Sequence, residues 1–294
     1  MTTTDLAAMA AAGRRRLEAA GFDAAKAGRD AVLLARSVLG WSAAEWLTRS
    51  DQAAPPNARD RFLARIERRA SREPIAYITG EREFYGRAFK VTRAVLIPRP
   101  ESEFVVEEAL LLLARRAPGS HAPFIVDVGT GSGCLGVTLA LEYPEARVVA
   151  TDISGAAIAV ATENAQALGA GDRVEFREGA FLAGIDGPID LVVANPPYVA
   201  ETDRPAMAPD VKDFEPAVAL FGGQDGLDTI RALLPLVSSA LAPGGWLVME
   251  MGCGQEDAVR ALIAQTSGLA CSHVREDLQG IPRVALVRSS KSEV

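Results

Sequence analysis

Residues Asn195, Pro196, Pro197 and Tyr198 are the part of this sequence whose types and spacing most clearly predict chemistry. They follow an apolar run, residues 189–194, that has the composition of a buried parallel strand. Ligands of α/β proteins bind at the carboxyl ends of such strands. The Asn195 side-chain oxygen and the Pro196 carbonyl can both accept hydrogen bonds from one NH2 group. We therefore expect a substrate with a planar nitrogen that carries hydrogens, held beside the flat face of Tyr198.

A glycine-rich loop earlier in the chain predicts the partner reagent. It follows a second apolar strand, residues 124–128, and precedes apolar residues at helical spacing. The dinucleotide fingerprint needs a last glycine where this chain has Cys134. Asp152 ends the next predicted strand, where an acidic side chain binds ribose hydroxyls. The pattern favours S-adenosylmethionine, because its sulfonium and ammonium groups would suit Asp127 and it has no pyrophosphate to be bound.

The residues expected to act at this edge fall into two groups. The cofactor contacts are Asp127, Gly129, Thr130, Gly131, Ser132, Gly133 and Asp152, together with Asn195, which touches the substrate and borders the cofactor. The catalytic residues are Asn195, Pro196 and Tyr198, and Pro197 joins them as a substrate contact.

The composition argues against several other classes of protein. Two histidines, His121 and His273, and three scattered cysteines do not predict a histidine-dependent hydrolase, a disulfide framework or a metal site. A net charge of -7 opposes broad binding of nucleic acid. We find no uncharged stretch of about 18 residues and no signal-peptide pattern, so we expect a cytoplasmic protein without a membrane span.

The hydrophobic pattern divides the chain into three parts. Residues 1–72 have apolar residues at helical spacing and predict a small helical domain. Residues 75–96 alternate more like strands, with Gly80 and Gly86 as turns, and predict a β-hairpin within a linker at 73–97. Residues 98–294 alternate strands and helices and predict an α/β domain. Its predicted strands are 124–128, 148–151, 174–177, 189–194, 246–250, 269–275 and 283–287, the last two forming an antiparallel pair.

Several further motifs occur in a fixed order between about Arg14 and Val287. They are 73–80 (Glu-Pro-Ile-Ala-Tyr-Ile-Thr-Gly), 82–85 (Arg-Glu-Phe-Tyr), 96–103 (Leu-Ile-Pro-Arg-Pro-Glu-Ser-Glu), the glycine loop, 195–198, 214–216 (Phe-Glu-Pro) and 250–252 (Glu-Met-Gly). Together they resemble the HemK/PrmC family of protein-glutamine N5-methyltransferases. The resemblance implies a seven-stranded, Rossmann-like class I SAM-dependent methyltransferase fold. It also implies methylation of the glutamine in the Gly-Gly-Gln motif of class 1 peptide chain release factors, which act in translation termination.

The resemblance places Phe181 near the adenine of the cofactor. Family members commonly have Asp just before this aromatic residue, whereas this chain has Ala180, which leaves the contact to the adenine amino group open. The segment 98–100 (Pro-Arg-Pro) with Glu103 resembles a family element beside the cofactor. Both a direct contact by Arg99 and a structural ion pair at a helix start would explain it.

Residues 222–224, Gly-Gly-Gln, repeat the proposed substrate motif inside the chain itself. We interpret them as a turn before a helix at 227–241, because glycines followed by Asp225 and Gly226 are typical of turns. Self-methylation is the less economical explanation.

The expected mechanism follows from the weak nucleophilicity of an amide nitrogen. Two acceptors on its hydrogens would direct the lone pair toward the sulfonium methyl for direct in-line transfer.

A nucleic-acid adenine-N6 methyltransferase is the alternative, because the same corner suits an exocyclic amine; it would need a basic target-recognition domain, which this acidic chain lacks. A non-catalytic adaptor would not need the glycine loop, Asp152 and Asn195 together. We expect residues 1–72 to grip the release factor, with no direct nucleic-acid substrate.

Overall fold

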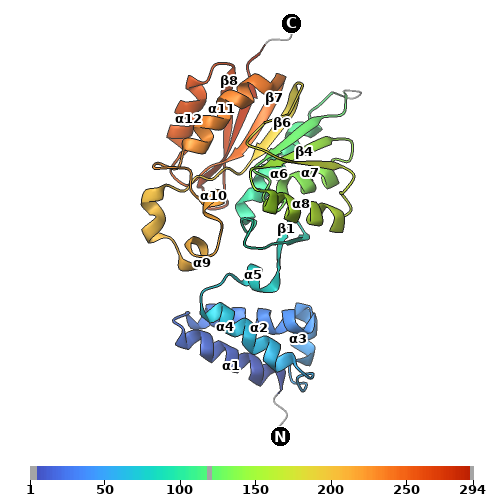
Figure 1. Ribbon diagram of the computed structural model, residues 1–294, viewed down its shortest axis with the longest axis vertical. Helices are drawn as coiled ribbons and strands as arrows, with labels where there is room; N and C mark the ends of the chain where they lie inside the picture. Colours follow the sequence, from blue (N-terminus) through green and yellow to red (C-terminus); the bar gives the residue numbers. More distant parts are fainter. Residues whose placement is uncertain (1–4, 118–120, 292–294) are drawn as a thin grey trace. The chain divides into compact units, whose positions relative to one another are not determined.

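The computed structural model describes residues 5–117 and 121–291 (Figure 1). The chain separates into two compact units. The first contains the chain up to Gly80 together with Ala208–Phe214, and the second contains Glu81–Met207 and the chain from Glu215 onward. In the part of the chain that is described, no helix is long and apolar enough to cross a membrane.

The first unit is a small bundle of helices. Its helices are α1 Leu6–Ala19, α2 Ala24–Leu39, α3 Ala43–Arg49, α4 Ala58–Ala70, α5 Ile75–Thr79 and, from the later segment, α9 Pro209–Lys212. Asp5, Asp23 and Ser42 precede the first three helices, and each side chain accepts a backbone N–H of the first turn. Leu17, Leu34 and other apolar side chains on the inner faces are fully buried, as the helical spacing predicts.

An ion-pair cluster holds the later segment in the first unit. The Arg69 side chain is 2% exposed and donates to Asp30 at 2.8 Å. Asp210 in α9 lies 3.7 Å from the Arg69 guanidinium and 3.8 Å from the Lys26 ammonium. A buried arginine needs such partners, because an unpaired charge in the interior is costly. Through these ion pairs, Asp210 attaches residues 208–214 to the helical unit.

The second unit is built on a seven-stranded sheet. Its strands are β3 Phe124–Val128, β4 Arg147–Asp152, β5 Val174–Glu178, β6 Ile189–Ala194, β7 Leu241–Glu250, β8 Leu269–Glu276 and β9 Pro282–Ser289. Their order is β5-β4-β3-β6-β7-β9-β8. Strands β3 to β7 pair in parallel, while β9 is antiparallel to both β7 and β8. The predicted strands and the antiparallel pair at the end of the chain are therefore confirmed.

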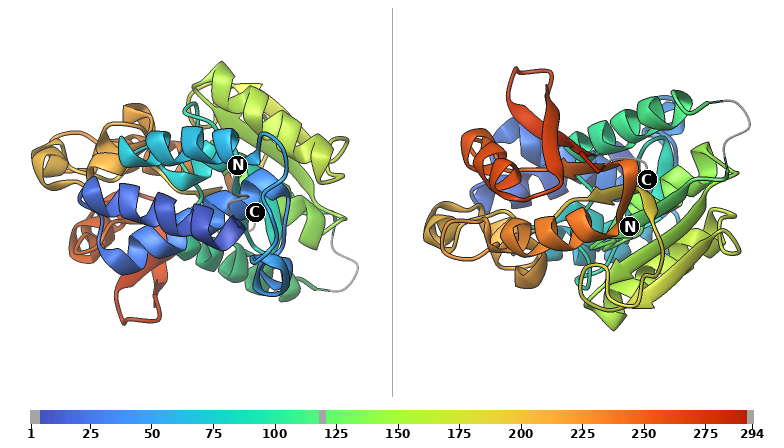
Figure 2. Two further views of the ribbon diagram at one scale, coloured as in Figure 1. Left: turned by 90° about the horizontal axis from the view of Figure 1, so that it is seen from below. Right: turned by 90° about the horizontal axis from the view of Figure 1, so that it is seen from above.

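Helices cover both faces of this sheet (Figures 1 and 2). They are α6 Glu103–Ala114, α7 Cys134–Glu142, α8 Gly155–Ala167, α11 Asp228–Ala240 and α12 Glu256–Gln265. The second unit also contains the short helix α10 Ala217–Leu220 and the 3-10 turns η1 Pro100–Ser102 and η2 Glu201–Ala206. Successive strand residues point to opposite faces. Ile125 packs in the core beneath α6, α7 and α8, and its neighbour Val126 packs in the core beneath α11 and α12.

The strand order brings the predicted chemistry to one edge. Strand β3 is central, the chain adds β4 and β5 on one side of it and then returns to add β6 on the other, which makes a topological switch point between β3 and β6. Val128 pairs with Ala194, and Ala194 pairs with Met249. The residues that follow β3, β6 and β7 therefore emerge side by side at the carboxyl edge of the sheet.

The predicted hairpin over 75–96 is wrong at its start. The hairpin contains only β1 Glu81–Phe84 and β2 Arg87–Lys90, which pair antiparallel around Gly86, and Ile75–Thr79 is helix α5. Gly80 ends that helix in the left-handed conformation at φ 86°. Tyr77 and Ile78 are buried on the helix, so tertiary packing decided the conformation of a segment whose alternation suggested a strand. The assignment of 73–97 as a linker stays a prediction.

Candidate active site

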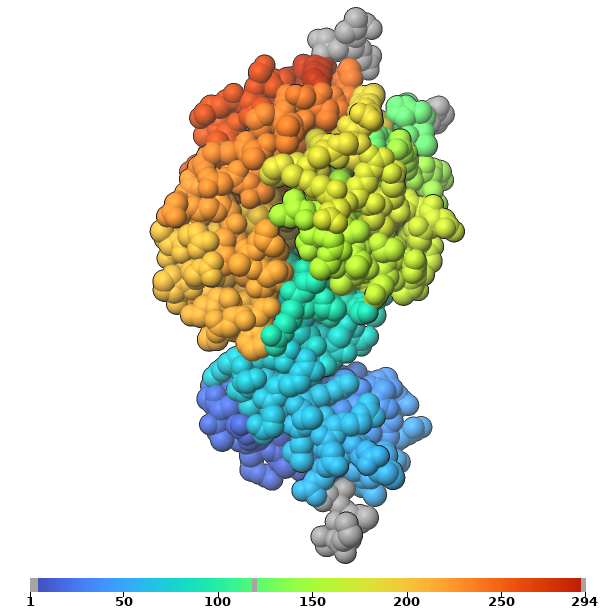
Figure 3. All heavy atoms as spheres, in the orientation of Figure 1, coloured from blue at the N-terminus to red at the C-terminus, as the bar shows by residue number. Residues whose placement is uncertain are grey.

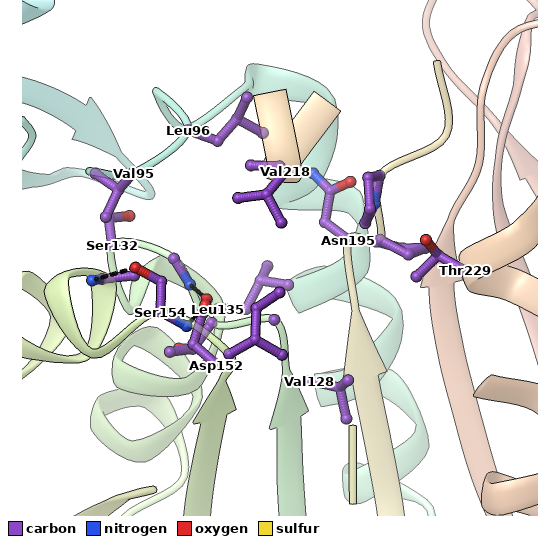
Figure 4. Close-up of a pocket in the computed structure, with 18 of the residues that line it drawn as sticks. Val95, Leu96, Val128, Ser132, Leu135, Asp152, Ser154, Asn195, Val218 and Thr229 are labelled. Atoms are coloured by element: carbon purple, nitrogen blue, oxygen red, sulfur yellow. Dashed lines mark hydrogen bonds between the residues drawn. The ribbon is translucent and has the colours of Figure 1, made fainter. Parts of the chain in front are cut away.

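A cavity of about 450 Å³ opens at the carboxyl edge of the sheet in the second unit. Figure 4 shows that Asp152, Ser132, Asn195 and Thr229 approach it from different elements, and Figure 3 shows the surface of this unit hollowed between its yellow-green and orange segments. The lining is mostly apolar, with a few polar groups. This size and character are typical of sites for small organic ligands of about 300 to 1,000 Å³.

The glycine loop forms one wall of this cavity. Gly129, Gly131 and Gly133 have φ values of 72°, 55° and 84°, a conformation that side chains rarely tolerate. A Cβ atom at Gly129 would meet no atom within 4 Å, whereas one at Gly133 would lie 3.2 Å from the Ala161 Cβ. The loop therefore uses glycine for its turns and, at Gly133, for close packing on α8. Thr130 and Ser132 line the same wall.

Asp127 lies behind the loop and is not among the residues that line the cavity. Its carboxyl accepts the Thr130 hydroxyl at 2.6 Å and the Gly136 backbone N–H at 2.9 Å, both on Oδ2. Oδ1 is buried and has no hydrogen-bond partner within the described chain. Burial raises the pKa of Asp127 to about 6. The structure thus gives this carboxyl a visible role in shaping the loop.

Asp152 faces the cavity from the end of β4. Its Oδ2 accepts the Gly131 backbone N–H and its Oδ1 accepts the Ser154 backbone N–H, each at 2.9 Å. Each carboxylate oxygen can accept a further hydrogen bond. The side chain is therefore fixed in direction and still able to bind hydroxyl groups of a ligand.

Ala180 and Phe181 also line the cavity. Phe181 has a φ of 51°, unusual for an aromatic residue, and its carbonyl accepts the Thr151 hydroxyl at 2.7 Å. An apolar wall at this position suits a flat aromatic ring of a ligand. Ala180 brings no side-chain acceptor there, as the sequence predicted.

Asn195 stands at the end of β6, with Pro196 and Pro197 beside it in the cavity wall. Its Nδ2 donates to the Ser102 hydroxyl oxygen at 2.9 Å. No hydrogen bond to Oδ1 from another described residue is found. One acceptor of the asparagine amide thus stays available to a ligand.

Tyr198 does not line the cavity, although its sequence position suggested a flat surface for the substrate. Its hydroxyl donates to Glu250 Oε1 at 3.0 Å, and Ser102 donates to Glu250 Oε2 at 2.5 Å. Burial raises the pKa of Tyr198, and the nearby Glu250 raises it further. Tyr198 therefore supports the corner from behind.

The segment 222–226 packs directly under the Asn-Pro-Pro-Tyr corner. A Cβ at Gly222 would lie 2.5 Å from the Pro197 carbonyl oxygen, and one at Gly226 would lie 2.2 Å from the Tyr198 carbonyl oxygen. The Gln255 side chain also donates to that Tyr198 carbonyl at 3.0 Å. Close packing thus explains the glycines at 222–226, and the Gly-Gly-Gln triplet forms a turn ahead of α11 as predicted.

Arg99 reaches the cavity wall and also makes an ion pair. Its guanidinium donates to Glu215 Oε1 at 2.7 Å, and Glu215 Oε2 accepts the Ile97 backbone N–H at 3.1 Å. Glu103 turns away and accepts the Tyr85 backbone N–H at 2.9 Å. Arg99 therefore fits both explanations, because it makes an ion pair and also lies in the cavity wall. Glu103 has a structural role and fixes the hairpin.

The structure brings most of the predicted site residues to one cavity. Those in its wall are Gly129, Thr130, Gly131, Ser132, Asp152, Phe181, Asn195, Pro196 and Pro197. Asp127 and Tyr198 lie behind the wall, and Gly133 supports the loop. Ser102 and Glu250 were assigned no role from the sequence, although a glutamate at the end of an apolar strand is a signal for a buried polar contact.

Known structures share the fold of this chain. A methyltransferase from Pyrococcus furiosus has a TM-score of 0.51 and 17% identity, over 77% of this chain and 96% of that one. The hMettl16 catalytic domain in complex with an RNA hairpin has a TM-score of 0.55 and 14% identity, over 81% of this chain and 84% of that one. At these identities the likeness shows fold alone. The sheet order and these neighbours define the class I SAM-dependent methyltransferase fold.

Sequence relatives define the family. Residues 9–80 match the model of the PrmC N-terminal domain, and residues 102–210 match that of the methyltransferase small domain. The release factor glutamine methyltransferase of Cereibacter sphaeroides is 42% identical over 93% of this chain and 94% of its own length. That of Geobacter sulfurreducens is 46% identical over 74% of both chains. The protein belongs to the family of release factor glutamine methyltransferases.

Proposed function

We propose that this protein transfers a methyl group from S-adenosylmethionine to the side-chain amide nitrogen, N5, of the glutamine in the Gly-Gly-Gln motif of class 1 release factors. Family membership supports the substrate class, and the available Oδ1 of Asn195 at the cavity wall is the observation that carries the chemistry. The adenine-N6 alternative gains no support from relatives named for glutamine methylation. The proposed setting is the cytoplasm, during translation termination.

The cavity residues fit an S-adenosylmethionine molecule. Asp152 has acceptors for ribose hydroxyls, the backbone around Gly129 and Gly131 leaves open space, and Phe181 gives the adenine an apolar wall. The cofactor supplies an electrophilic methyl group on a sulfonium. Asp127 would hold the loop in shape, and Thr130 and Ser132 would border the ligand.

Asn195 and Pro196 would hold the substrate amide. Asn195 Oδ1 and the Pro196 carbonyl accept the two amide hydrogens, which turns the nitrogen lone pair toward the methyl group. As positive charge grows on that nitrogen, both dipoles stabilise it without reorganising. Pro196 and Pro197 keep this corner rigid, because their rings fix the backbone.

The proton is not removed by Tyr198 in this account. Its hydroxyl already donates to Glu250, and its pKa is raised by burial, so the phenolate form is disfavoured at neutral pH. An amide methylated on nitrogen is a strong acid before it loses its proton, so transfer to water suffices. Tyr198 is thus proposed as an orienting residue.

The test uses labelled S-adenosylmethionine with a purified class 1 release factor, total RNA and DNA in separate reactions. We expect label only in the release factor, at the glutamine of Gly-Gly-Gln when the peptides are mapped. A release factor with Gln→Ala in that motif is the matched control and should stay unlabelled. Label in RNA or DNA at comparable rates would contradict the proposal.

A further inference from the structure

A chain of three hydrogen bonds runs from Asn195 into the protein interior. Asn195 Nδ2 donates to Ser102 Oγ at 2.9 Å, Ser102 Oγ donates to Glu250 Oε2 at 2.5 Å, and Tyr198 donates to Glu250 Oε1 at 3.0 Å. Ser102 and Glu250 are each 2% exposed. The chain connects a group in the cavity wall with a buried carboxylate that the cavity does not reach.

The chemistry of these groups fixes the direction of every bond in the chain. The Ser102 hydroxyl donates to Glu250, whose carboxylate form can only accept, so the one hydrogen of that hydroxyl points away from Asn195. Ser102 then presents only lone pairs toward Asn195. The asparagine amide must therefore point its NH2 group at Ser102. If its oxygen faced those lone pairs instead, two acceptors would be in contact without a hydrogen bond.

The consequence lies on the other side of the asparagine. An amide group has its NH2 and its oxygen on opposite arms, so with Nδ2 held by Ser102, Oδ1 is the arm left for a ligand. The opposite orientation would present an NH2 group to the substrate NH2, two donors that cannot bond. Which arm faces the substrate decides whether the corner works.

We infer that Ser102 and Glu250 are positioning residues that set the orientation of the Asn195 amide, so that its oxygen and not its NH2 group receives the substrate amide. The inference rests on the proposed role of Asn195. Glu250 does not line the cavity, whereas Ser102 lies in its wall at 2% exposure; both residues are assigned their effect through the asparagine. Asn195 thereby enters each turnover already oriented, and no binding energy is spent on turning it.

The groups around Glu250 have opposing effects on the ionisation of its carboxyl group. Two hydroxyl donors, Ser102 and Tyr198, and the positive charge of Arg283 favour the carboxylate. Burial opposes it most, and Glu101 adds to the opposition, so the pKa of Glu250 is raised. A buried acid whose charge is only partly compensated costs stability. Such a cost is expected where function, and not folding, requires the charge.

Glu250→Gln is the test variant, because it keeps the size of the side chain and removes its charge. A glutamine can donate to Ser102, whose hydroxyl can then donate to Asn195 Oδ1, so the wrong amide orientation becomes available. We expect kcat on the release factor to fall about tenfold to a hundredfold, the range for one hydrogen bond to a charged group. The cofactor dissociation constant should stay unchanged, and the melting temperature should stay equal or rise.

Ser102→Ala and the double variant Ser102→Ala/Glu250→Gln distinguish an effect through the Asn195 amide from general damage to the structure. Ser102→Ala breaks the same chain in the middle and should also lower kcat. Because both residues act through one amide, the double variant should lose no more than the worse single variant. Glu145→Gln, at an exposed glutamate, is the matched control for loss of one carboxylate and should keep the activity of the wild type.

Near-normal kcat in a folded Glu250→Gln protein would overturn the inference, as would losses that multiply in the double variant. A parallel fall in melting temperature and cofactor affinity would also overturn it, since that pattern indicates structural damage. Wild-type protein that fails to methylate the release factor would instead refute the proposed function. The two failures are therefore distinguishable.

Discussion

Asp127 carries a carboxyl group that the fold buries completely behind the cofactor loop. Its pKa is raised to about 6, chiefly by burial, from an ordinary value of 3.8. The folded protein therefore binds this proton more tightly than the unfolded chain does. The contribution to stability is fully present below about pH 4 and is lost as the pH rises through about 6.

We predict that Asp127→Asn removes this pH dependence. The free energy of unfolding of the wild type, relative to the variant, should rise by on the order of 3 kcal/mol between pH 7 and pH 4, from a shift of about two units. Denaturant unfolding of both proteins at several pH values measures the difference. A difference that stays constant over this range would show that Asp127 has an ordinary pKa.

Asp152 should act on the cofactor and not on the transfer step. Replacing it with Ala removes a charged acceptor from the ribose hydroxyls, and we expect cofactor binding to weaken by about 1.5 to 3 kcal/mol. Calorimetric titration with S-adenosylhomocysteine measures this. Asp152→Asn keeps one acceptor and should lose less. An unchanged dissociation constant in Asp152→Ala would remove this residue from the site.

The corner after β6 depends on the turn that packs beneath it. Gly226 and Gly254 both have a φ of 78°, but a Cβ at Gly226 would lie 2.2 Å from the Tyr198 carbonyl oxygen, and one at Gly254 would meet nothing within 4 Å. The two glycines thus form a matched pair with the same backbone strain and different surroundings.

We predict that Gly226→Ala lowers kcat at least tenfold, because the corner must shift to make room. Gly254→Ala should cost only about 1 kcal/mol of stability from its backbone conformation, with kcat near that of the wild type. Steady-state kinetics and thermal unfolding of both variants measure this. Equal effects of the two substitutions on kcat would mean that the turn does not position the corner.

The strands were predictable because each is a continuous apolar run, and the edge was predictable because parallel strands place their carboxyl ends together. Helix α5 was not predictable from the sequence, because only the burial of Tyr77 and Ile78 in the folded protein distinguishes it from a strand. Asp127 and Tyr198 lie at the predicted edge of the sheet but do not line the cavity. The contact between Ser102 and Glu250 could not be predicted, because the two residues are 148 positions apart in the sequence and meet only in the folded chain.

The helical unit contains part of the later chain. Residues 208–214 group with it, through Asp210 and its partners Arg69 and Lys26. This segment lies in sequence between the Asn-Pro-Pro-Tyr corner and Glu215, which binds Arg99. The helical unit carries none of the proposed chemistry, which agrees with a role in gripping the release factor.

We predict that a protein truncated to begin at Glu81, with Asp210→Asn to neutralise the orphaned acid, keeps its cofactor affinity. Its kcat/KM on the whole release factor should fall by a hundredfold or more, because remote binding energy is lost. Activity on a short Gly-Gly-Gln peptide should change little. Circular dichroism must first show that the truncated form is folded. Equal losses on peptide and protein would assign the unit to support of the fold.

We propose that Asn195 presents its amide oxygen to the glutamine of a release factor. Single-turnover methyl transfer to purified release factor, by wild type and by Asn195→Ala preloaded with S-adenosylmethionine, tests it most directly. We predict a rate at least about a hundredfold lower in the variant, as for one preorganised polar contact, with the cofactor dissociation constant unchanged. Transfer at a near-normal rate by a folded, cofactor-bound Asn195→Ala protein would contradict the account.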